Sequence, residues 1–269
     1  MKFKQTMKFQ LNDIIPDSLY KYRNYKSELH KRIITHQEIY FSKPSEFLVP
    51  YDCTYQVDRD FVKNEQNRRK YYSKFCGIPN LNDPKIDYLI NSNPITDKLI
   101  DKLEIDYQNK LDQITGVFSG SLTNRNNNLW KVFGGNNKGF CVELNLLDTF
   151  PLNFGSKGYV KYVKKEDLPK SKVLYTENDI DFFIYTTDLI FNLPIEFSEE
   201  QEYRIEKLFF NDNDRVFKIN KNQIKSITLG YKMSQSSRTE IIELIKTHLP
   251  NVIIKRLKYD RKNLKEIIC

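Results

Sequence analysis

The sequence has no alanine, one tryptophan, three histidines and four cysteines in 269 residues. The cysteines are scattered without a C-x-x-C spacing, and none forms a ligand-like pair with a histidine. A zinc site needs closely spaced Cys and His ligands, and a disulfide scaffold needs dense cysteines in a short chain. Neither class fits, so we expect no metal site and no disulfide framework.

The chain also lacks a long apolar run. No segment approaches the roughly 18 apolar residues that a membrane-spanning helix requires. The first residues, MKFKQTMKF, are too few and too polar for a secretory signal. We therefore expect no membrane partner and a cytoplasmic location.

The hydrophobic content of 39% and the aromatic content of 13% are sufficient for a globular core. Lys, Asn and Ile are abundant, and the formal net charge is +8. This charge permits an anionic partner such as a nucleotide or a nucleic acid, but interleaved acidic residues mean that it does not require one.

The residue pattern predicts an α+β fold: a single domain, residues 1–269, with a central mixed sheet and a helical insertion at about 58–113. Alternating or short apolar segments predict strands at 19–23, 38–42, 116–118, 140–144, 158–162 and 200–210, with 216–219 as a hairpin partner of the last. Helices are expected at 24–36 and 178–193. Three more are expected in the insertion, where Leu99, Leu103, Tyr107 and Leu111 form one stripe.

The C-terminal part predicts a strand-helix-strand unit at about 224–257. A strand at 224–229 ends at Gly230, and Ser237 with Glu240 gives a capping-box pattern for a helix through His248. A strand at 252–257 follows. Two strands joined by such a helix crossover should be parallel.

The sequence is organised around residues 116–144. A buried strand here ends in Ser119-Gly120-Ser121, a polar loop leads to Trp130, and a second strand follows. Small hydroxyls beside a large aromatic ring make a candidate wall for a small-molecule pocket. The alternative is a core unit in which Trp130 only fills space.

Several segments together resemble the bacterial domain-of-unknown-function family 2971. They are LYKYR at 19–23, IYFSKPSEF at 39–47, GVFSGSLTNRNNNLW at 116–130, KGFCVEL at 138–144, EQEYRI at 200–205 and IKSITLG at 224–230. The chain departs from the family at 48–52, LVPYD instead of an Asn-Asp-Pro-Phe-Asp loop, and at Val132-Phe133 instead of a His-Tyr pair. The family name implies no activity.

Glu200 and Glu202 are two residues apart on an expected strand, so their carboxylates should share a face. Two adjacent carboxylates repel, which raises the pKa of one and creates an acid/base pair. The alternative is a solvated edge strand whose polar face Arg204 continues.

Arg23, the strand with Ser119 and Ser121, and Glu202 follow one another in an order that resembles ADP-ribosyltransferases of the arginine-serine-glutamate type. The resemblance implies that Arg23 holds the phosphates of NAD, that the serines shape the pocket for the nicotinamide ribose, and that Glu202, with Glu200, stabilises the cation formed as the glycosidic bond breaks. Tyr20, Tyr22 or Trp130 would stack on the flat rings.

The leading hypothesis is therefore an NAD-consuming enzyme resembling ADP-ribosyltransferases, with NAD as substrate, a protein or nucleic-acid acceptor, and a role as a toxin or antiphage effector. It requires Arg23, Ser119 or Ser121, and Glu202 to line one cleft, with Arg23 and Glu202 roughly 10–15 Å apart. Arg23 and Glu202 on opposite faces of the sheet would make it wrong.

The alternative hypothesis is a non-enzymatic defence protein that binds nucleic acid or a protein partner through a basic surface. The segment 67–72, NRRKYY, combines charge with aromatic rings. Such a segment is also typical of a solvated helix face.

Overall fold

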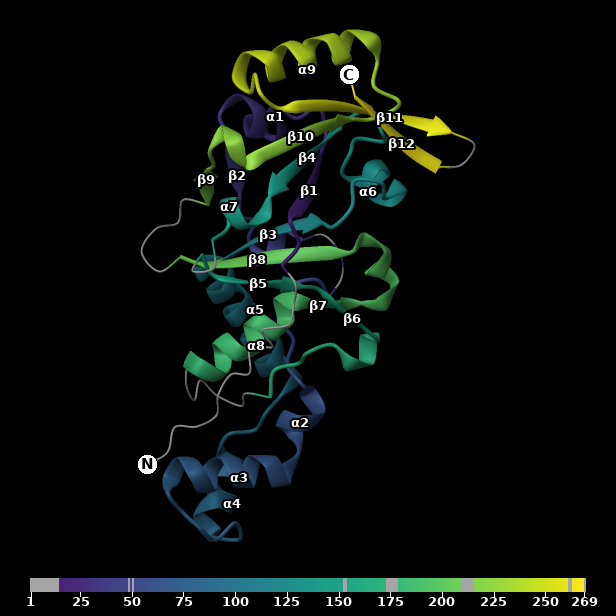
Figure 1. The fold of residues 1–269 in the computed structure, drawn as a ribbon. Helices are drawn as coiled ribbons and strands as arrows, with labels where there is room; N and C mark the ends of the chain where they lie inside the picture. The colour runs from purple at the N-terminus through teal and green to yellow at the C-terminus, as the bar shows by residue number, and fades with distance from the viewer. Residues whose placement is uncertain are drawn as a thin grey trace.

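A computed structural model describes residues 15–47, 49, 51–151, 154–172, 179–209, 215–260 and 263–268 (Figure 1). The N-terminal segment MKFKQTMKF, part of the loop at 48–52, and Cys269 lie outside the described residues. The helices are α1 (Glu28–Thr35), α2 (Arg59–Lys63), α3 (Glu65–Cys76), α4 (Pro84–Ser92), α5 (Asp97–Ile114), α6 (Asn127–Val132), α7 (Leu146–Thr149), α8 (Asp179–Phe191) and α9 (Gln235–His248). The strands are β1 (Ser18–Arg23), β2 (Glu38–Tyr40), β3 (Thr115–Ser121), β4 (Phe140–Asn145), β5 (Ser156–Tyr159), β6 (Lys161–Val163), β7 (Asn192–Pro194), β8 (Glu202–Leu208), β9 (Val216–Lys218), β10 (Ile224–Leu229), β11 (Ile253–Asp260) and β12 (Asn263–Ile268).

One eight-stranded mixed sheet forms the centre of the molecule, in the order β12-β11-β10-β4-β1-β3-β8-β5. The predicted α+β class with a central mixed sheet is thus confirmed. β10 and β11 pair in parallel, as predicted for a strand-helix-strand unit, and β10 also pairs with β4, which joins this unit to β1. The predicted hairpin of β8 and β9 is wrong, because β9 pairs with β2 instead.

The sheet twists sharply between β1 and β3, where the ladder consists of the single pair Tyr20 and Ser121. In Figure 1, β3, β8 and β5 run across the view while β1 runs steeply up it. A sheet with such a break has backbone groups between the two strands that the ladder does not satisfy. The amine of Lys21 fills this role on one side by donating to the carbonyl oxygen of Ser119.

The two faces of the sheet differ in chemistry. One, here called the apolar face, carries Leu19, Phe118, Phe140 and Ile205, which pack in a large core together with residues of α1 and α9. The other, here called the polar face, carries the row Glu143, Tyr20, Ser121 and Glu202, because directly paired residues point to the same side. The amphipathic pattern of α1 and α9 explains why they cover the apolar face.

The helical insertion extends away from the sheet as a lobe (Figure 1). It contains α2 to α5, one helix more than predicted. The buried stripe of α5 uses Ile100, Tyr107 and Leu111, with Leu103 partly buried, so the prediction of Leu99 in this stripe is wrong by one position. Arg59 ties the lobe together through ion pairs to Asp97, Asp101 and Glu104 of α5.

Two other local predictions need correction. The capping box at Ser237 and Glu240 does not form: the N-cap of α9 is Ser234, and Glu240 contacts Lys31 instead. The strand expected at 158–162 is divided between β5 and β6, which pair with β8 and β7 respectively. Across the described ranges, no helix is long and apolar enough to cross a membrane.

Candidate functional site

Glu202 is the centre of a polar cluster on the polar face. It is the first residue of β8, it is buried, and its neighbour across the ladder is Ser121 of β3. The hydroxyl of Ser119 donates to Oε2 of Glu202, and Nε of Arg204 donates to the same oxygen over 2.9 Å. The backbone N–H of Glu202 donates to the hydroxyl of Tyr162 over 2.8 Å. The first two contacts hold the carboxylate in position, and the third holds the backbone at the start of β8.

Arg204 has no exposed surface, and it joins this cluster to the loop before α2. Its Nη1 and Nη2 donate to the two carboxylate oxygens of Asp52 over 2.7 and 2.9 Å. Nη1 also donates to the carbonyl of Ile190 over 2.8 Å, and the guanidinium lies 5.0 Å from the centre of the Phe47 ring. A bidentate pair of this kind is both strong and directional.

Glu200 lies in a 3₁₀ helix, Ile195–Glu200, and not on the strand. Gln201, with φ of 47°, adopts the left-handed conformation between the two glutamates. The prediction that Glu200 and Glu202 share a strand face is therefore wrong. The two carboxyl groups nevertheless lie close together, since each shifts the pKa of the other.

The two carboxyl groups have different protonation states at neutral pH. Burial and then the charge of Glu202 raise the pKa of Glu200 to about 8. Burial alone would raise the pKa of Glu202 too, but the charge and hydrogen bond of Arg204, with the Ser119 hydroxyl, lower it. Near pH 7 the cluster thus holds a protonated Glu200 beside an ionised Glu202, which is a combination suited to acid/base chemistry.

The structure contradicts the predicted position of Arg23. Arg23 pairs with Phe140 along the β1–β4 ladder, and Phe140 belongs to the core on the apolar face. Glu202 lies on the polar face in the row with Tyr20 and Ser121. Because Arg23 and Glu202 are on opposite faces of the sheet, the predicted arginine-serine-glutamate cleft is wrong.

The other predicted pocket residues have structural partners. Ser121 is buried and donates to the carbonyl of Glu200 over 2.8 Å. Trp130 is fully buried, its indole N–H donates to the carbonyl of Asn124 over 2.6 Å, and Tyr22 packs edge-on against it with ring centres 5.2 Å apart. Trp130 and Tyr22 are thus core side chains, and the predicted stacking wall is not formed by them.

Tyr20 remains half-buried on the same face as Glu202. Burial, together with the nearby carboxylate of Glu143, raises the pKa of its hydroxyl to about 12. Of the predicted aromatic residues, Tyr20 alone stays in the same row as the carboxyl pair.

Sequence reasoning missed Asp52 and Lys21. Asp52 is the last residue of the LVPYD segment and lies 152 positions from Arg204, so only the folded chain brings the two together. The position of Arg204 was predictable from the sequence, because residues two apart on a strand point to the same face and Arg204 is two residues from Glu202. Lys21 is linked to Glu202 through Ser119, whose carbonyl accepts from Lys21 and whose hydroxyl donates to Glu202.

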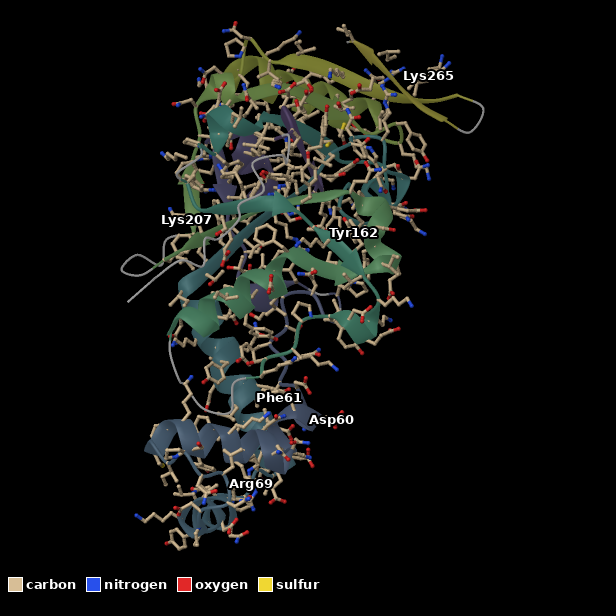
Figure 2. The ribbon with its side chains drawn as sticks, turned by 60° about the horizontal axis from the view of Figure 1, so that its bottom comes forward. Asp60, Phe61, Arg69, Tyr162, Lys207 and Lys265 are labelled. Carbon is tan, nitrogen blue, oxygen red and sulfur yellow. The ribbon has the colours of Figure 1, made fainter. Side chains whose placement is uncertain are left out.

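A cavity of about 1060 Å³ lies elsewhere, between α3, α8 and the segment 166–172. Phe61 and Asp60, which line it, are in the lobe, whereas Tyr162 is in the body beside Glu202 (Figure 2). Lysines and carboxylates both line this cavity, so it has no clear charge preference. Within the described ranges, no group of three or more His, Cys, Asp or Glu side chains could hold a metal ion.

Comparison of the chain with protein-family models, with curated proteins and with solved structures finds no match. The resemblance to domain-of-unknown-function family 2971 stays a prediction, and the function must be argued from the site.

Proposed function

We propose that the chain is an NAD glycohydrolase, an enzyme that breaks the bond between nicotinamide and ribose in NAD. The proposal rests on the buried Glu202, which Ser119 and Arg204 hold in place, and on the neighbouring Glu200, whose pKa is raised to about 8. Cleavage of this bond develops positive charge on the ribose, and a fixed carboxylate in a site of low polarity stabilises such charge.

In the proposed reaction, the carbon–nitrogen bond breaks and its electron pair leaves with nicotinamide, which departs as a neutral pyridine. The oxygen of a water molecule adds to the ribose carbon, and the water loses a proton to Glu202, which returns it to solvent. Glu200, in its neutral form, donates a hydrogen bond in the site and adds no second negative charge. Ser119 and Arg204 keep Glu202 ionised and in place.

The test is nicotinamide release from NAD, followed by proton NMR. We expect release by the wild-type chain and a loss of about 10²- to 10⁴-fold in kcat for Glu202→Gln. ADP-ribose should appear in the same amount as nicotinamide, because water is the acceptor. Less free ADP-ribose than nicotinamide would indicate transfer to a protein or nucleic-acid acceptor.

Glu143→Gln is the matched control. Glu143 is a half-buried glutamate on the same face, held by Ser18 and by Lys255, and it does not contact Glu202. Its variant should release nicotinamide at the wild-type rate. Absence of turnover in the wild-type chain, or equal loss in both variants, would contradict the proposal.

Glu200→Gln separates the roles of the two glutamates. If Glu200 acts in its protonated form, the wild-type rate should fall as the pH rises through about 8. Glutamine copies the neutral acid, so this variant should keep most of the activity at pH 7 and should lose the decline at high pH. A variant as inactive as Glu202→Gln would assign Glu200 a charged role instead.

A second candidate function is binding of a nucleic acid or a protein partner through the lobe. Phe75 and Tyr88 are large aromatic side chains that are 73% and 70% exposed, in a chain with a net charge of +8. Exposed rings with lysines nearby are typical of surfaces that stack unpaired bases. The NRRKYY segment itself is less available, because Arg68 and Arg69 are hydrogen-bonded within the lobe.

The two functions give different results with single-stranded nucleic acid. Three results together would favour the second candidate. Binding should weaken steeply with salt, it should fall in a double variant with Phe75→Ala and Tyr88→Ala, and it should occur without NAD turnover. A cytoplasmic toxin or antiphage role belongs to the first candidate. If the chain has this role, expression of the wild-type chain should lower the NAD content of the cell, and expression of Glu202→Gln should not.

A further inference from the structure

Three basic side chains gather where β1 meets α1. Lys21 and Arg23 are two residues apart on β1, so they share its apolar face. His30 comes from α1, and its Nδ1 accepts the backbone N–H of Asn24, the residue after Arg23, over 3.0 Å. With Nδ1 used as an acceptor, the ring proton of neutral His30 is on Nε2 and is available as a donor.

Among the described residues, no carboxylate forms a hydrogen bond or an ion pair with Lys21, Arg23 or His30, although the charge of Glu202 acts on Lys21 and opposes the fall of its pKa. The side chain of Arg23 makes no hydrogen bond or ion pair with any described residue, although it is half-buried. By contrast, Arg204, Arg59 and Arg69 each bind carboxylates. On α1 itself, the carboxylate of Glu28 is 2.8 Å from the amine of Lys31 and points to that partner.

The three groups disturb one another. Burial and then the charge of Arg23 lower the pKa of Lys21 to about 7. Burial, then the charges of Arg23 and Lys21, lower the pKa of His30 to about 4. Burial also lowers the pKa of Arg23 to about 10. Gathering like charges in a partly desolvated place is unfavourable unless an opposite charge joins them.

We propose that Lys21, Arg23 and His30 form a binding site for a phosphate group, either free or as part of a phosphate monoester. The guanidinium of Arg23 offers a planar pair of donors that matches two phosphate oxygens, and Lys21 and His30 add donors from the flanks. The amine of Lys21 has three hydrogens and spends one on the carbonyl of Ser119, which leaves two for a ligand.

This phosphate site is separate from the carboxyl pair of Glu200 and Glu202. It lies on the apolar face, and the pair lies on the polar face. Lys21 lies near both, through its contact with Ser119. The phosphate site therefore does not depend on the proposed NAD chemistry, and it can be tested without turnover.

The experiment is a proton–nitrogen NMR titration of the histidine rings. The chain has three histidines, and the His30 signal is identified by its loss in His30→Asn. Inorganic phosphate or AMP is added at constant ionic strength against sodium chloride. We expect a saturable change at His30 and a rise of its pKa above about 4, because a bound anion favours the imidazolium. A response to AMP without one to inorganic phosphate would assign the site to monoesters.

Arg23→Gln should weaken the binding by about tenfold or more, since it removes the paired donors. Arg125→Gln is the control, because Arg125 is an exposed arginine outside the site, 3.9 Å from Glu266. It should bind phosphate as the wild-type chain does. The signals of His36 and His248 report whether each variant keeps its fold.

Two results would overturn the proposal. One is a wild-type His30 signal that does not change, or that changes without saturation, in phosphate and AMP. The other is equal binding by folded Arg23→Gln and wild type. The wild-type titration alone decides the matter if Arg23→Gln does not fold.

Discussion

Arg204 shows how much of the site depends on one buried charge. Its guanidinium forms ion pairs with the carboxylates of Asp52 and Glu202. Burial alone would lower the pKa of Arg204, but the charges of these two carboxylates raise it well above the usual value. Removing one partner of a buried ionic group leaves the other charges uncompensated, which costs more than the intact group contributes.

The first prediction concerns this residue. Arg204→Met should lower the free energy of unfolding by about 3 to 5 kcal/mol, because two buried carboxylates lose their partner. Urea denaturation of the purified variant measures the change. Arg204→Lys should not restore the wild-type value, since a lysine amine does not reproduce the bidentate contact to Asp52.

Arg125→Gln is the exposed comparison and should change the free energy of unfolding by less than about 0.5 kcal/mol. A similar small change for Arg204→Met would show that the cluster contributes little to stability.

Strand alternation already contained the information that corrects the position of Arg23. In the LYKYR segment, Leu19, Lys21 and Arg23 must share one face, and Tyr20 and Tyr22 must share the other. A single pocket containing both Arg23 and Tyr20 was therefore at odds with a regular strand. What the sequence did not specify was the neighbour of β1, and so which of the two faces would meet Glu202.

At the scale of elements, the strands with strong apolar patterns were predictable. The expected strands at 140–144 and 224–229 match β4 and β10 within one residue, and the parallel β10–β11 pair follows from the helix between them. Short edge strands such as β2, β6 and β9 have few residues to carry a pattern. Their partners are decided by tertiary packing, which is why the predicted partner of β9 was wrong.

The loop that returns the chain to β4 depends on close backbone contact with β1. A Cβ atom on Gly139 would lie 2.1 Å from the carbonyl oxygen of Arg23 and 2.8 Å from that of Gly134. Both neighbours are backbone atoms, so a larger residue must displace the chain itself.

The second prediction follows for this element. Gly139→Ala should destabilise the fold by about 1 to 3 kcal/mol, because it forces β1 and the 134–139 loop apart. Thermal unfolding followed by circular dichroism measures the effect. Gly158→Ala on β5 is the matched control, since its nearest atoms, on the Phe191 ring, are 3.8 Å away. The control should stay within about 0.5 kcal/mol of wild type, and equal losses in both variants would contradict the prediction.

At the scale of the whole molecule, pH acts on stability through several buried groups with opposite signs. Glu200 and Glu206 have raised pKa values, so they favour the folded state at low pH. His30 and Lys21 have lowered pKa values, so they favour it at higher pH. The dependence of the free energy of unfolding on pH is the sum of these opposite contributions. The contribution of one group is therefore measured as the difference in that free energy between a variant and the wild type.

The third prediction isolates Glu206. It is 3% exposed, accepts from Thr187 over 3.3 Å, and burial raises its pKa to about 7. Between pH 5 and pH 7 the folded state keeps this proton while the unfolded chain loses it, so the contribution of Glu206 to stability decreases as the pH rises. Glu206→Gln stays neutral and should lack this contribution to the slope, which is at most about 1.4 kcal/mol per pH unit.

The measurement is the free energy of unfolding in urea at pH 5, 6 and 7 for wild type and variant. The stability of wild type relative to Glu206→Gln should fall steadily across the three values. Glu240→Gln serves as the comparison, because the neighbouring Tyr25 hydroxyl and Lys31 lower the pKa of this exposed carboxyl, which stays ionised throughout the range. A constant difference between wild type and Glu206→Gln would mean that Glu206 is already ionised at pH 5. The polar face would then hold one more buried negative charge, beside those of Asp52 and Glu202, which Arg204 binds.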